Sequence, residues 1–196
     1  MTPQEKITGQ FLQNKQANED SLEILAEFIV SASEMLIQCL LKGNKILCCG
    51  NGGSASASQH FSSELINRYE MNRPALPGLA LTTDSSTITS ISNDDHFRNI
   101  FARQIKAFAQ PGDVLVVFTT SGESINIVEA IKAAHSRNLV ILALSGKDGG
   151  LLPELMRDED LELRVPSAST ARIQEIHLLI THCLCGMIDD RLFGES

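Results

Sequence analysis

The chain has 196 residues, with 16 lysines and arginines against 24 aspartates and glutamates, which gives a net charge of −8. Its length suits one domain, and its 43% hydrophobic content is enough for a sizeable core, so we do not expect disorder. An acidic chain with eight Phe, one Tyr and no Trp lacks the basic and aromatic surface of a typical nucleic-acid-binding protein.

Two further features predict a cytoplasmic protein that does not enter a membrane. No uninterrupted apolar run reaches the length of about 18 residues that a membrane span requires, and residues 1–16 contain no apolar core of a signal peptide. The cysteines are odd in number and form no C-x-x-C pair, which agrees with that location (Cys39, Cys48, Cys49, Cys183 and Cys185).

The first segment predicted to be helical is amphipathic. Apolar residues recur at helical spacing over residues 21–42, and Gly43 follows as a C-terminal cap. We expect the first 42 residues to form an N-terminal helical hairpin that takes part in oligomer packing, outside an α/β core of residues 43–196.

From residue 45 onward, short apolar runs alternate with helical stretches. The runs predict strands at Lys45–Cys49, Gly78–Leu81, Asp113–Phe118, Val140–Leu144 and Leu161–Val165. The stretches between and after them predict helices at about 54–69, 85–93, 97–109, 124–137 and 172–192. This alternation predicts an α/β fold in which a five-stranded parallel sheet carries helices on both faces, within one domain of residues 1–196. In such a sheet ligands bind at the carboxyl ends of the strands, where loops begin at Gly50, Leu81, Thr119 and Ser145.

The last predicted helix, 172–192, is apolar around most of its circumference. A helix of this kind is buried on nearly all sides, and in a protein of this size a partner subunit is a plausible source of the second covering. We therefore expect a homo-oligomer.

Two loops between a strand and a helix have the composition of phosphate-binding loops. Thr119–Ser124 offers four hydroxyls and a glycine before a helix N-terminus, where free N–H groups attract anions. An ordinary turn with Ser124 as the helix cap is the alternative, and the place of the loop after a strand favours phosphate. Gly50–Ala55 is glycine-rich but has no P-loop lysine, so it indicates only close backbone approach to a ligand.

Two helical segments carry polar groups that could form a site. His60 and Glu64 are four residues apart and share one helix face, which suits two metal ligands, an acid/base pair or an ordinary salt bridge. On the apolar C-terminal helix, polar side chains are costly to bury without partners, so several of them together favour a site (Gln174, Glu175, His177 and His182).

These motifs, with several others, resemble in order those of the phosphoheptose isomerases of the sugar isomerase (SIS) domain superfamily. The resemblance covers nearly the whole chain and rests on residues 49–54 (CGNGGS), 59–65 (QHFSSEL), 72–74 (NRP), 93–94 (ND), 120–124 (TSGES), 146–150 (GKDGG) and 171–177 (ARIQEIH). It implies a flavodoxin-like SIS fold, a homotetramer with active sites between subunits and one zinc ion per subunit. It also implies isomerisation of sedoheptulose 7-phosphate to D-glycero-D-manno-heptose 7-phosphate, for the lipopolysaccharide core.

The resemblance also implies a role for individual residues. The substrate-binding positions correspond to Asn51, Gly52, Gly53, Glu64, Asn93, Asp94, Thr119, Thr120, Ser121, Ser124 and Gln174. The zinc ligands correspond to His60, Glu64, Gln174 and His182, and the acid/base pair to Glu64 and His182. On a regular helix Gln174 and His182 lie about 12 Å apart, so a shared ion is only just within reach.

The chain departs from the family pattern at a few positions. Thr119 replaces a serine and keeps the hydroxyl, whereas Glu123 replaces an asparagine and adds a negative charge beside the expected phosphate site. Ala171 stands where some members have an aspartate, so that position has no catalytic role in this chain.

The expected reaction is an aldose–ketose isomerisation through an enediol, with Glu64 as the base and His182 moving protons between the oxygens. The alternative is a non-enzymatic SIS tetramer that binds a replication initiator protein. The presence of both Glu64 and His182 favours the enzyme. A sugar-phosphate-sensing regulator is disfavoured, because residues 1–42 are too short and not basic enough for a DNA-binding domain.

Overall fold

All five predicted strands form one parallel sheet in the computed structural model, which describes residues 1–194. The strand order is β2-β1-β3-β4-β5, so the chain reverses its direction of progress across the sheet between β1 and β3. This order is that of a flavodoxin-like doubly wound sheet. The strands are β1 (Ile46–Gly50), β2 (Gly78–Ala80), β3 (Val114–Phe118), β4 (Val140–Gly146) and β5 (Leu161–Val165).

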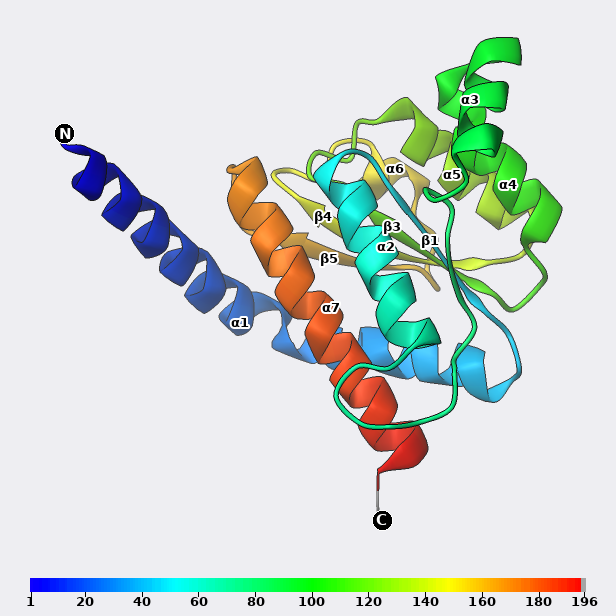
Figure 1. Ribbon diagram of the computed structural model, residues 1–196, viewed down its shortest axis with the longest axis horizontal. Helices are drawn as coiled ribbons and strands as arrows, with labels where there is room; N and C mark the ends of the chain where they lie inside the picture. The colour runs from blue at the N-terminus through cyan, green and yellow to red at the C-terminus, as the bar shows by residue number, and fades with distance from the viewer. Residues whose placement is uncertain (195–196) are drawn as a thin grey trace.

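The helices cover both faces of the sheet, as expected (Figure 1). The long helix α1 (Pro3–Leu41), α2 (Gly53–Ile66) and α7 (Thr170–Phe193) pack on one face. The other face is covered by α4 (Ile100–Phe108) and α5 (Ile125–Ser136). The smaller elements are α3 (Ser85–Asp94), η1 (Phe97–Asn99) and α6 (Leu152–Leu155), of which α6 was not expected from the sequence.

Alternate residues of the central strands supply the two cores. In β1, Ile46 and Cys48 belong to the core beneath α1, α2 and α7, while Leu47 and Cys49 belong to the core beneath α4 and α5. Every residue of β1 and β3 is buried. Because both faces of these strands are covered, their sequences are continuous apolar runs rather than alternating ones.

The N-terminal segment is one continuous helix of 39 residues, so the expected helical hairpin is wrong. Thr2 and Glu5 form a capping box that starts it, and residues 10–42 contain neither Gly nor Pro to break it. Its first part extends away from the domain (Figure 1), and the buried positions begin at Ala17.

By length and composition alone, α1 contains a window that could cross a membrane, which differs from the expectation drawn from uninterrupted runs. The second half of the helix explains this window differently. Leu25, Ala32, Leu36 and Ile37 are buried in the core with residues of α7 and the sheet. The same composition therefore serves as a core helix of this domain.

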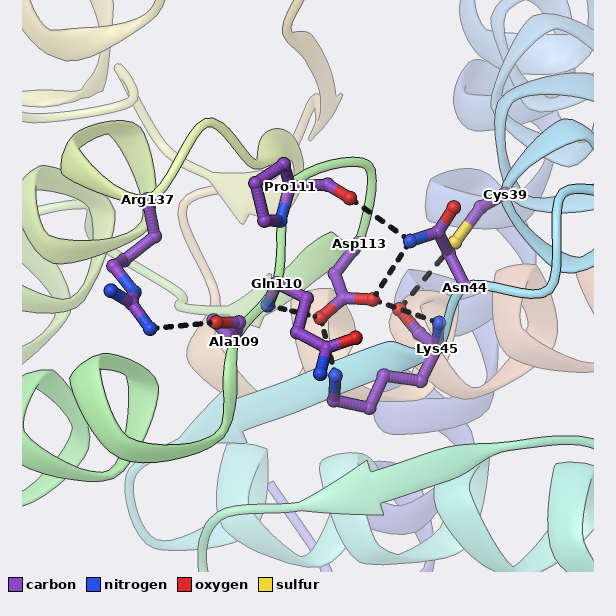
Figure 2. Close-up of polar contacts among 8 residues, drawn as sticks. All are labelled: Cys39, Asn44, Lys45, Ala109, Gln110, Pro111, Asp113 and Arg137. Atoms are coloured by element: carbon purple, nitrogen blue, oxygen red, sulfur yellow. Dashed lines mark hydrogen bonds and ion pairs between the residues drawn. The ribbon is translucent and has the colours of Figure 1, made fainter.

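A polar cluster ties the start of β1 to the start of β3 (Figure 2). The buried carboxylate of Asp113 accepts hydrogen bonds from the backbone N–H of Lys45 (3.0 Å) and of Gln110 (2.7 Å), and pairs with the Lys45 ammonium at 2.6 Å. Burial on its own would raise the pKa of this carboxyl, but the Lys45 and Gln110 donors hold it below its ordinary value. The cluster lies at the amino edge of the sheet, opposite the edge where ligands bind.

Replacing Asp113 with Asn should lower the free energy of unfolding by about 1–3 kcal/mol at pH 7. Because the folded-state pKa is lowered, the contribution of the carboxylate is complete above about pH 5 and is lost as the pH falls through the lowered folded-state value. Urea unfolding of both proteins from pH 7 to pH 3 measures this, with the exposed Asp158→Asn as control. A difference between Asp113→Asn and wild type that stays constant down to pH 3 would contradict the assignment.

Candidate active site

The two loops at the reversal of strand order meet through a pair of asparagine side chains. Asn51 follows β1, and Asn126 lies in the first turn of α5 after β3. Their amides exchange two hydrogen bonds of 2.8 Å each. Gly52 adopts φ 55° as the N-cap of α2, a conformation that favours glycine. Asn126 was not identified from the sequence, because the burial of its amide in the first turn of α5 is seen only in the structure.

A cavity of about 70 Å³ lies between these loops, and all four hydroxyl residues expected to bind phosphate line it. The lining consists of Asn51, Ser54, Phe118, Thr119, Thr120, Ser121, Ser124 and Gln174. The Thr119 hydroxyl accepts a hydrogen bond from the backbone N–H of Gly122 (3.1 Å), and the Ser121 hydroxyl accepts one from the backbone N–H of Glu123 (3.3 Å). These two bonds fix the turn.

Two helices begin at this cavity without a side-chain cap. The N-cap of α2 is Gly52, which has no side chain to offer. The N-cap of α5 is Ser124, whose hydroxyl accepts no hydrogen bond from the first turn. The N–H groups of Ser54, Ala55 and Ile127 donate to backbone carbonyls, so the other N–H groups of these first turns and the positive dipole ends of α2 and α5 are what remains available to a small anion. Because these donors are neutral groups, the acidic net charge of the chain is no obstacle.

Gln174 closes one side of the cavity and packs against Gly53. A Cβ atom built on Gly53 would lie 2.6 Å from the Gln174 amide nitrogen, so a larger residue at position 53 would make the Gln174 side chain shift. Its expected role in binding substrate stays a prediction. Within the described residues no hydrogen bond joins Gln174 to either expected zinc-binding histidine, so its role as a metal ligand stays a prediction.

Three of the expected functional side chains do come together between α2 and α7. The Nε2 atoms of His60 and His182 are 3.0 Å apart, and the Glu64 carboxylate lies 3.5 Å from His60 Nε2. The Tyr69 ring stacks on His182 with centroids 5.5 Å apart and an interplanar angle of 22°. One histidine can donate to the other, so the pair can hold and move a proton beside a carboxylate.

This donor set is suited to a divalent metal. Two imidazole nitrogens and a carboxylate are ligands that zinc prefers, and ligands at about 2.0–2.1 Å in a tetrahedral shell leave roughly 3.3 Å between two nitrogens. The 3.0 Å between the two Nε2 atoms is close to that separation. Among residues 1–194, however, no three His, Cys, Asp or Glu side chains are arranged so that they could hold a metal ion, so the zinc site stays a prediction.

The other polar residues of α7 have structural partners. His177 is fully buried beside the Ser145 carbonyl oxygen, with its Nε2 atom 2.9 Å away, and burial lowers the pKa of its imidazole to about 4. It is therefore neutral at pH 7 and donates to that oxygen. Glu175 accepts from Arg172 (2.6 Å) and from Asn14 of α1 (2.7 Å), which holds α1 against α7.

Asn93 and Asp94 lie apart from the cavity in the single chain. They are exposed at the end of α3, where the Asn93 amide donates to the Asp94 carboxylate at 2.8 Å. α3 packs against η1 and α4. Their expected role in binding substrate therefore stays a prediction that the fold of one chain does not explain.

The cysteines take no part in this arrangement. Cys48 and Cys49 are fully buried, and burial raises the pKa of each thiol. Burial likewise raises the pKa of Cys185 to about 12. These thiols remain protonated at neutral pH and act as small apolar side chains.

Comparison with known proteins gives one consistent result. The model of the SIS domain family matches residues 10–146. The chain is 56% identical over 193 residues to a phosphoheptose isomerase of Chromohalobacter salexigens, with 98% of each chain covered. It is 54% identical to that of Methylococcus capsulatus over the full length of both. The solved phosphoheptose isomerase of Neisseria gonorrhoeae superposes with a TM-score of 0.92 at 44% identity, covering 96% of this chain and 100% of that one.

Replacing Gly53 with Ala should weaken the binding of inorganic phosphate by about tenfold or more, because the new methyl group displaces Gln174 and narrows the cavity. Isothermal titration with phosphate measures the effect. Gly9→Ala is the matched control, since a Cβ atom there meets nothing within 4 Å. Unchanged phosphate affinity in Gly53→Ala would show that Gln174 does not shape an anion site.

Proposed function

The chain belongs to the phosphoheptose isomerases of the SIS domain family, which makes it a sugar-phosphate isomerase, and we propose that it interconverts sedoheptulose 7-phosphate and D-glycero-D-manno-heptose 7-phosphate. This reaction would supply the heptose precursor of the lipopolysaccharide core, in the cytoplasm. The observation that supports the chemistry most directly is the convergence of Glu64 and His182 beside His60.

The distance between the two parts of the site supports a long sugar chain as the substrate. Gln174 lines the cavity and packs against Gly53, and Gly53 and His60 are seven residues apart along α2, which is about 10 Å. A heptose 7-phosphate in its open-chain form carries its phosphate at one end and its carbonyl at the other. With the phosphate at Thr119–Ser124, the reacting carbons of such a chain can extend toward Glu64.

The proposed proton transfers use two side chains. The Glu64 carboxylate removes the C1 proton of the ketose, the C1–H electrons form the enediol double bond, and the carbonyl oxygen at C2 takes a proton. In the second half Glu64 returns a proton to C2, while the C1 hydroxyl loses its proton to become the aldehyde. His182 carries the proton between the two oxygens, a role that typically contributes 10²–10⁴-fold.

We further propose that one zinc ion per subunit is held by His60, Glu64 and His182, with Gln174 as a fourth ligand. When bound, the ion would polarise the sugar carbonyl and stabilise the enediolate as a Lewis acid. The protein residues orient the sugar and hold its phosphate whether or not the metal takes part in the reaction.

The isomerase is favoured over an initiator-binding SIS tetramer by the packing of the polar groups. The side chains of His60, Glu64 and His182 are partly exposed and lie close together between two helices. A protein that only binds an initiator has no need of such an acid/base pair. The phosphate-sized cavity at the neighbouring helix ends has the same implication.

A homotetramer is part of the proposal, and uncovered apolar side chains support it. Leu178 and Leu179 of α7 are 41% and 47% exposed in the single chain. Further large apolar residues of α1 are exposed along its length, namely Ile7, Phe11, Leu12, Leu22, Ile24, Phe28 and Val30. A second copy of the chain would cover these faces and complete the burial expected for α7.

Replacing Glu64 with Gln should abolish turnover while leaving affinity for the substrate largely unchanged, because the amide cannot take the C1 proton. The test incubates each protein with sedoheptulose 7-phosphate, with and without chelator, and follows the aldose product by NMR. Glu70→Gln, a nearby exposed carboxylate, is the control. Full activity in Glu64→Gln would refute its role as the base, and wild type inactive in both conditions would favour the partner-binding alternative.

Sedimentation equilibrium should give a mass of about four chains, since the exposed apolar faces of α1 and α7 require covering. Replacing Leu178 and Leu179 with Asp should lower that mass, because charged groups are costly to bury in an interface. A mass of 21.3 kDa, that of one chain, for the wild type would rule out the oligomer.

A further inference from the structure

The catalytic arrangement depends on two helices, α2 and α7, which run side by side in the same direction (Figure 1). Contacts between them, or with the segment that follows α2, occur at three levels. Gln174 meets Gly53 at the first level, His182 meets His60 at the second, and Asp189 meets Arg73 at the third. The first two levels belong to the site described above, whereas the third is outside it.

The third level is a fully buried ion pair. The Arg73 side chain is 0% exposed and the Asp189 side chain 4% exposed, and Arg73 Nε donates to Asp189 Oδ1 at 2.8 Å. A buried charge pair of this kind is a weak source of stability, because the loss of hydration offsets most of the attraction. Its geometric effect on the two helices is therefore of more interest than its energy.

Arg73 also completes the C-terminal end of α2. Its guanidinium donates to the carbonyl oxygens of Glu64 (2.7 Å) and Leu65 (2.7 Å), which belong to the last turn of the helix. Carbonyls in a last turn have no partner within their own helix, and a positive charge there is favourable. One of the two carbonyls that Arg73 holds is that of Glu64, the proposed base.

Asp189 lies on the same helix as His182, the proposed proton carrier. The two residues are seven apart on α7, which is two turns, so their side chains leave the same face of the helix. Arg73 therefore joins the backbone of Glu64 on α2 to the α7 face that carries His182.

We propose that Arg73 and Asp189 are positioning residues, which set the distance between Glu64 on α2 and His182 on α7 and thereby couple the two proton transfers. The proposal rests on the function proposed above. Loosening this contact would leave Glu64 able to remove the C1 proton, but His182 would no longer be in place to move the proton between the oxygens.

The test compares two rates in ²H₂O, with sedoheptulose 7-phosphate as substrate. Entry of deuterium at C1 of recovered ketose reports proton removal, and formation of the aldose reports the complete reaction. In Arg73→Lys and Asp189→Asn, we expect kcat for the aldose to fall by about 100-fold, the loss that a displacement of about 1 Å can cause. Deuterium entry should fall much less, so that the ratio of exchange to isomerisation rises about tenfold, with KM changed less than threefold.

The ratio is independent of how much protein is folded, which separates positioning from stability. Arg137→Lys is the matched control, because Arg137 donates to the carbonyl of Ala109 at the end of α4, away from α2 and α7. It should leave the ratio unchanged.

Equal losses of exchange and isomerisation in both variants would overturn the proposal. Failure of both variants to fold would overturn it too, because either result would show that the Arg73–Asp189 contact serves only to hold the fold together. If wild type isomerises and the variants keep the wild-type ratio, only the positioning role fails. If wild type neither exchanges nor isomerises, the proposed function fails, and the positioning role fails with it.

Discussion

The register between β1 and β3 is the constraint on which the rest of the site depends. Gly50, the last residue of β1, lies opposite Phe118, the last residue of β3, so the two strands end level with each other. The loops that follow therefore start at the same height, and α2 and α5 begin side by side. The paired amides of Asn51 and Asn126 and the cavity between the loops follow from this alignment. A shift of one residue in this pairing would separate the two helix ends.

An acidic protein that acts on a phosphate ester needs an anion site without a basic surface. In the proposed site the donors would be hydroxyls and backbone N–H groups at helix ends, which attract a compact anion at short range. Glu123 next to this loop is exposed, and its backbone N–H, donating to Ser121, is the part of it that shapes the turn. The negative net charge disfavours binding of a polyanion such as nucleic acid, and it is compatible with one phosphate group held by local dipoles.

The sequence was most informative where the pattern of apolar residues in an element matches the number of its faces that are buried. Strands such as Val114–Phe118 are buried on both faces, which makes them continuous apolar runs that are easily recognised. The N-terminal hairpin was wrong because a turn was assumed in a stretch without Gly or Pro, where helix formation continues. The spacing of His60 and Glu64 predicted that these two side chains share a helix face, and the family resemblance implied that His182 joins them. The structure contains both contacts. Arg73 and Asp189 are 116 residues apart, and no local pattern reveals that two such charges are buried together.

The reciprocal amide pair has a consequence for binding affinity. Each of the two asparagines uses one N–H and the carbonyl oxygen in the pair, which leaves its second N–H available. Their side chains are thus ordered before any ligand arrives, so the rotational entropy of these groups, about 0.5–1.5 kcal/mol for each immobilised side chain, is lost during folding rather than on association. Preorganisation of this kind allows a small cavity with few direct contacts to retain a ligand that a flexible loop of the same composition would release.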